Sequence, residues 1–83
     1  MARPVRAAAV GFALVLGERE GVVRDVRRFD VHGSPYVDVT IAEEGRVLET
    51  ARLGAESVPE DLEVGERVMV SRAMSVIVAI RRP

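Results

Sequence analysis

The chain contains no cysteine, no tryptophan and no lysine, and its only histidine is His32. Without cysteine, neither a disulfide nor a thiolate-bound metal can stabilise the fold, and the same absence is typical of a reducing compartment. We therefore expect a cytoplasmic protein. A lone histidine in a turn is poor support for a metal site or a Ser-His-Asp triad, and no glycine-rich phosphate loop is present. The sequence predicts a protein that is not an enzyme and needs no cofactor.

Positive and negative charges nearly cancel, and the basic residues are all of one type. All twelve basic residues are arginine, and with thirteen acidic residues they give a net charge of −1. Codon usage in a GC-rich genome would explain the missing lysine, as would selection against a modifiable amine, and the sequence leaves both open. A charge close to zero lacks the electrostatic footprint of nucleic-acid binding, so the composition disfavours nucleic acid as a partner.

The chain is short and rich in apolar residues. Its 83 residues are enough for one domain, residues 1–83, and 48% of them are hydrophobic. A domain of this size buries a smaller share of its surface than a large one. The apolar fraction therefore favours a buried subunit interface, and we expect a homo-oligomer or a protein partner.

The N-terminal part is the most apolar stretch. Arg3 and Arg6 precede an apolar run, Ala7–Leu16, that only Gly11 interrupts. The run is too short to span a membrane, which takes about 20 apolar residues, and no small-x-small cleavage site follows it. We predict a buried strand or a short helix, with the strand preferred. Residues 1–17 would then be an apolar strand or partner-binding arm, and residues 18–83 the barrel body. A truncated membrane anchor is the alternative.

Valine-rich segments after this run predict β-structure. Gly21–Phe29 predicts a long strand in which Gly21 permits a bend or bulge. Its apolar side chains would divide between two faces, Val22 and Val26 on one and Val23, Phe29 and Val31 on the other. A turn is expected at His32–Pro35, and then a strand, Tyr36–Ile41, that directs Val37, Val39 and Ile41 inward.

The second half of the chain repeats the pattern of short strands and turns. Gly45 predicts a hairpin loop, followed by a strand, Arg46–Leu53, with Val47, Ala51 and Leu53 on its inner face. A loop with one helical turn, capped by Ser57 with Glu60, should follow. Val68 and Val70 alternate inward, and the β-branched run Val76–Ile80 predicts a strand buried on both faces. Together these signals predict an all-β protein, a small barrel of about five or six strands.

A family resemblance rests on several short matches from Gly21 onward. They are Gly21-Val22-Val23, Tyr36-Val37-Asp38-Val39, Gly45 with Leu48, Glu56-Ser57-Val58, Leu62-Glu63-Val64-Gly65-Glu66-Arg67-Val68, and Ser71-Arg72-Ala73-Met74-Ser75-Val76. This order resembles the small OB-like TOBE (molbindin-type) domains, which bind molybdate or tungstate; SH3-like barrels share the Leu-x-Val-Gly-x-x-Val step. The resemblance implies that Arg72, Ala73 and Ser75, with backbone N–H groups, would hold a small anion at a subunit interface.

A local basic cluster suggests a different ligand. Arg24, Arg27 and Arg28 lie close together, and Tyr36 could stack on a base, as single-strand binding requires. Phe12 and Phe29 are expected in the core. The leading interpretation is a non-enzymatic, self-associating binding and assembly module without a membrane span. Binding of a small oxyanion and contact with nucleic acid are the alternatives.

Overall fold

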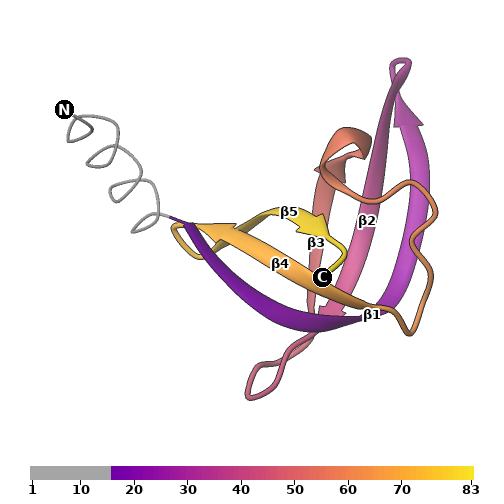
Figure 1. Cartoon of the computed structure of the whole chain (residues 1–83). Coiled ribbons are helices and arrows are strands. Elements are labelled where there is room, and N and C mark those ends of the chain that lie inside the picture. The colour runs from indigo at the N-terminus through magenta and orange to yellow at the C-terminus, as the bar shows by residue number, and fades with distance from the viewer. Residues whose placement is uncertain (1–15) are drawn as a thin grey trace, which may run out of the picture.

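The computed structural model describes residues 16–83 as an all-β domain, which confirms the predicted class (Figure 1). Its strands are β1 (Leu16–Val31), β2 (Ser34–Ala42), β3 (Glu49–Gly54), β4 (Arg67–Ala73) and β5 (Val76–Arg81), and one 3-10 turn, η1 (Ala55–Ser57), follows β3. Among these residues no helix is long and apolar enough to cross a membrane. The predicted N-terminal strand or arm and Phe12 lie almost wholly outside the described residues; only Leu16 and Gly17 belong to β1.

The five strands form one antiparallel sheet in the order β3-β2-β1-β4-β5. β1 lies at the centre, pairing with β4 through its first half and with β2 through its second. The sheet is strongly curved, and β3 and β5 come into contact (Figure 1). These two strands are the ends of the described sheet and do not pair with each other. The sheet is therefore curved but not closed by hydrogen bonds.

β1 bends where the sequence predicts an irregularity. A Cβ atom on Gly21 would lie 2.7 Å from Cγ2 of Ile41, so only glycine lets β2 pack this closely. The register with β2 shifts between Val23 and Asp25, which marks a β-bulge. The extra residue puts Val26 against the core on the same side as Val23 and turns Phe29 outward. Grouping Phe29 with Val23 in the core was therefore wrong.

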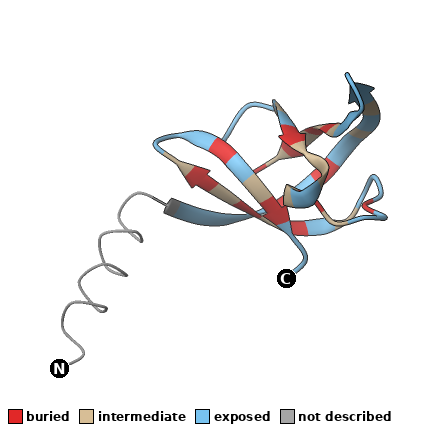
Figure 2. Cartoon of the chain, turned by 90° about the horizontal axis from the view of Figure 1, so that it is seen from above, coloured by how far each residue is buried: buried red, intermediate tan, exposed pale blue. Residues whose placement is uncertain are grey.

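The core of the described domain is aliphatic. Its buried members are Val23, Val37, Val39, Ile41, Leu53, Val58, Leu62, Val68, Val70, Ile77 and Ile80. Figure 2 shows the buried positions recurring along the strands and interrupted by exposed ones. This confirms the predicted inward alternation of β2 and β4, because successive side chains of a strand point to opposite faces.

The third strand begins later than predicted. β3 runs from Glu49 to Gly54, so the predicted strand Arg46–Leu53 starts three residues too early and ends one residue too soon. Leu53 is buried and Ala51 packs on the core, but Val47 is 87% exposed, and its predicted inward orientation was wrong. Gly45 takes the predicted positive φ, 77°, in the loop.

Two further expectations fail. The 3-10 turn begins after Gly54 and ends at Ser57, so Ser57 does not cap it and the predicted capping pair with Glu60 was wrong. β5 was predicted to be buried on both faces, but only Ile77 and Ile80 are buried, and Val76 and Val78 are exposed. No element of residues 16–83 covers the outer side of β5, so Val76 and Val78 stay exposed.

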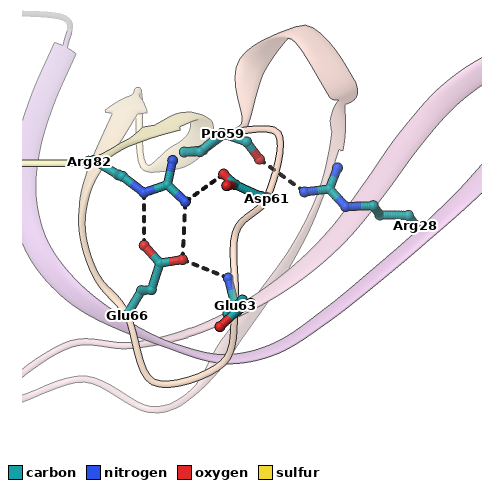
Figure 3. A network of polar contacts seen from close by, with 6 residues as sticks. All are labelled: Arg28, Pro59, Asp61, Glu63, Glu66 and Arg82. Carbon is teal, nitrogen blue, oxygen red and sulfur yellow. Dashed lines mark hydrogen bonds and ion pairs between the residues drawn. The ribbon is translucent and has the colours of Figure 1, made fainter.

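Two arginines, Arg82 after β5 and Arg28 on β1, anchor the segment between η1 and β4 (Figure 3). The Arg82 guanidinium donates to Glu66, 2.9 Å from Nε to Oε1, and to Asp61, 2.9 Å from Nη2 to Oδ1. Glu66 also accepts a hydrogen bond from the Glu63 N–H, 2.8 Å. From β1, Arg28 donates to the carbonyl oxygen of Pro59, 2.9 Å. The segment is thereby fixed against the sheet, with two of its apolar side chains in the core.

Candidate functional site

Arg72 on β4 lies in a buried cluster with two carboxylates. Its Nη1 donates to Oε1 of Glu43, 3.0 Å, and its Nη2 to Oε1 of Glu49, 2.7 Å. Glu43 follows β2 and Glu49 begins β3, so Arg72 binds both ends of the β2–β3 loop, in which Val47 is exposed. Hydrogen bonding to Glu43, and then to Glu49, raises the pKa of Arg72, while burial opposes this.

The residues predicted to hold an oxyanion do not converge. Arg72 is buried, Ala73 is half-buried at the end of β4, and Ser75 is exposed in the β4–β5 turn. Both Nη atoms of Arg72 already bind carboxylates, although its Nε has no hydrogen-bond partner within residues 16–83. A small anion would therefore have to displace Glu43 or Glu49, which disfavours this position as an anion site.

Exposed apolar side chains gather on the β4–β5 hairpin. We call Ala73, Met74, Val76 and Val78 the apolar hairpin face; Met74 is 81% exposed and Val76 61%. Leu16, the first residue of β1, pairs with Ala73. The start of β1 accordingly lies beside the β4–β5 turn (Figure 1). Leu16, the last residue of the predicted apolar run, is thus placed next to this face.

The turn that presents Met74 has an unfavourable backbone. Met74 and Ser75 have φ of 52° and 76°, in the left-handed region that favours glycine. The β1–β2 turn has similar angles, with φ of 50° at His32 and 84° at Gly33, and there glycine takes the second position. A non-glycine residue in this region costs about 1 kcal/mol or more. Met74 is thus held exposed in a turn whose backbone its own side chain does not favour.

A second surface lies on the outer side of β1, β2 and β3. Arg27, Asp38 and Arg52 are cross-strand neighbours in one row. Arg52 binds Asp38 through two hydrogen bonds, 2.9 Å from Nε and 3.1 Å from Nη2, and Arg27 lies 3.7 Å from the same carboxylate. The hydrogen bonds from Arg52 are the main cause that lowers the pKa of Asp38. In the next row, Thr40 and Thr50 share a hydrogen bond of 2.7 Å.

Two aromatic rings lie beside this polar row on the same face of the sheet. Phe29 and Tyr36 are opposite one another, with ring centroids 6.1 Å apart and planes 23° from parallel. The Arg52 guanidinium lies over Phe29, with Cζ 4.6 Å from the ring centroid. Both rings are only partly buried. We call Arg27, Phe29, Tyr36 and Arg52 the stacking platform.

The sequence-predicted basic cluster is divided by the fold. Arg27 shares the outer face with Tyr36, but Arg28 points the other way, toward Pro59. Arg24 is exposed at the bulge. Sequence reasoning missed Phe29 and Arg52 as platform members. The alternation of β2 against the next strand could have placed Arg52 opposite Asp38, had the register been known.

Metal chemistry finds no support in residues 16–83, where no three His, Asp or Glu side chains gather as a ligand set. His32 is exposed in the β1–β2 turn. Comparison of the chain with protein-family models, with curated proteins and with solved structures finds no match. The function is therefore inferred from the geometry of the chain itself.

Proposed function

We propose that this chain is a non-enzymatic binding and assembly module, a small OB-like barrel domain that associates with further copies of itself. The strand order, with β1 shared by two antiparallel ladders, fits a five-stranded Greek-key barrel that is open between β3 and β5. Such barrels commonly serve as binding modules. The proposal of a non-enzymatic role rests on the residue inventory, which has no cysteine and a single histidine.

The observation that carries the assembly proposal is the apolar hairpin face. β5 is apolar on both sides, yet the domain covers only the side that holds Ile77 and Ile80. Strands that are apolar on both sides are usually buried on both sides. A second copy supplies a matching apolar surface, and a twofold-symmetric contact would use Met74 and Val76 twice.

The position of the apolar run supports the same partner. The run Ala7–Leu16 enters the sheet where Leu16 pairs with Ala73, beside the exposed Met74. Leu16 is the last residue of this run in the sequence, and Met74 and Val76 are exposed on the adjacent hairpin, a combination that favours an apolar contact patch between copies. Burial of this patch between copies would also offset the modest stability of so small a domain.

Analytical ultracentrifugation of the full chain at micromolar concentration tests the proposal. We expect a mass above that of the monomer, and Val76→Lys should shift it toward the monomer by placing a charge in the contact. Val64→Lys is the matched control, because Val64 is 62% exposed against 61% for Val76 but lies in the turn before β4. A monomeric wild-type chain, or equal effects of the two variants, would overturn the proposal.

A further inference from the structure

The aromatic residues of the described domain are on its surface. The buried core is aliphatic, whereas Phe29 and Tyr36 stand side by side on the outer face of the first two strands. Large rings contribute most to stability when they are fully buried in a core, and these two are only partly buried. Their placement indicates a surface that receives a ligand.

The chemistry of the stacking platform favours a flat, unpaired base. The Arg52 guanidinium lies over Phe29, with Cζ 4.6 Å from the ring centroid, and its side chain remains 61% exposed, so it offers a further surface for stacking. Gly54 is the residue opposite Tyr36 on β3, and it places no side chain over that ring. Aromatic rings and guanidinium planes are the groups on which proteins stack unpaired bases. We propose that the stacking platform binds single-stranded nucleic acid.

Charge around the platform sets the kind of binding. On the outer face, Arg27 and Arg52 are accompanied by Asp38, and the Glu56 carboxylate lies beside Gly54. The surface is thus close to neutral, and stacking rather than attraction to phosphates must supply most of the affinity. With about two phosphates neutralised, log K should fall with log salt at a slope of about −1.4, shallower than for strongly basic binders.

The single tyrosine gives a direct readout of the contact. The chain has one tyrosine and no tryptophan, so its intrinsic emission comes from Tyr36 alone. Titration with oligothymidylate of about ten nucleotides, the length suited to a small barrel, should quench this emission after correction for absorption. A duplex of equal length should leave the emission unchanged, because its bases are already stacked inside the helix.

Binding by variants is measured with the same oligonucleotide carrying a fluorescent label. Tyr36→Leu should weaken binding about tenfold or more, the effect of losing one stacked base, and Phe29→Leu should also weaken it because it removes the ring that supports Arg52. Arg27→Ala should weaken binding less and reduce the salt slope by about 0.7. Arg46→Ala removes the same charge from the exposed β2–β3 loop and serves as the matched control.

The outcomes separate this proposal from the assembly proposal. Quenching by the single strand, lost in Phe29→Leu but kept in Val76→Lys, supports the platform whatever the oligomeric state. No quenching at low salt overturns it, as does equal binding of single strand and duplex. Equal losses in Arg27→Ala and Arg46→Ala would assign the binding to general charge and overturn it as well. Quenching by a proline-rich peptide with none by the oligonucleotide would show a protein ligand instead.

Discussion

Replacing Arg72 by methionine tests the buried ion cluster. The change keeps an unbranched apolar stem but removes the guanidinium, which leaves the Glu43 carboxylate, 2% exposed, with Arg19 at 3.7 Å as its one remaining ion-pair partner among residues 16–83. Removing one member of a buried ion pair costs about 3–5 kcal/mol, because the other charge stays desolvated and unpaired. A domain of this size has a free energy of unfolding of about 4–12 kcal/mol, so Arg72→Met should lose about a quarter of it or more.

A double variant distinguishes a desolvated charge from simple loss of packing. Arg72→Met combined with Glu43→Leu removes both buried charges and puts apolar groups in their place. The double variant should be within about 1 kcal/mol of the wild type, and so more stable than Arg72→Met alone. Glu49 loses its partner in both variants at little cost, because its side chain is partly exposed.

Urea unfolding followed by circular dichroism measures these differences at one fixed protein concentration, since association shifts apparent stability. With a slope of about 1 kcal/mol/M, a loss of about 3 kcal/mol moves the midpoint by about 3 M. Arg81→Met is the control, because it removes a bidentate but exposed ion pair with Glu18. This change should shift the urea midpoint little. Equal losses in Arg72→Met and Arg81→Met, or a double variant no better than the single, would refute the reasoning.

Three other measurements follow from the backbone and from the ion pairs. Gly21→Ala should lower the free energy of unfolding by about 1–3 kcal/mol through its contact with β2, whereas Gly17→Ala, with open space around it, should not. Ser75→Gly should raise it by up to about 1 kcal/mol by relieving the left-handed backbone; an unchanged urea midpoint would argue against strain there. Arg82 lowers the pKa of Glu66 below its ordinary 4.5, so their ion pair stabilises the fold above that pH and the stabilisation is lost as pH falls. Arg82→Gln should therefore narrow the gap between urea midpoints at pH 7 and about pH 3, and an unchanged gap would count against it.

Local patterns predicted the regular parts of the sheet. Strict alternation in Tyr36–Ile41 identified β2 and its inward valines, and the glycine at position 33 identified the turn before it. Both signals depend only on neighbouring residues, because the period of a strand and the sterics of a turn are local properties. Gly21 likewise marked the bend of β1, where a side chain would collide with Ile41.

The rest depended on contacts between distant segments. The bulge between Val23 and Asp25 reverses the facing of every later residue of β1, so Phe29 was assigned to the wrong side. The late start of β3 accompanies the binding of Arg72 to the two ends of the preceding loop, and no local pattern predicts that contact. For the same reason the sequence identified only two members of the stacking platform, Arg27 and Tyr36. The contact between Arg52 and Phe29 depends on the register of three strands.

The sharing of β1 between two ladders has a consequence for the order of folding. Its second half pairs with β2 across a two-residue turn. Its first half pairs with β4, which is far away in the sequence, since residue 16 pairs with residue 73. Because closing a long loop is slow, we expect the β1–β2–β3 meander to form first. During that interval the first half of β1 is an unpaired edge that could template aggregation. The charged residues Glu18, Arg19 and Glu20 occupy this edge. Their charges would disfavour pairing with strands of other chains until β4 has paired with β1.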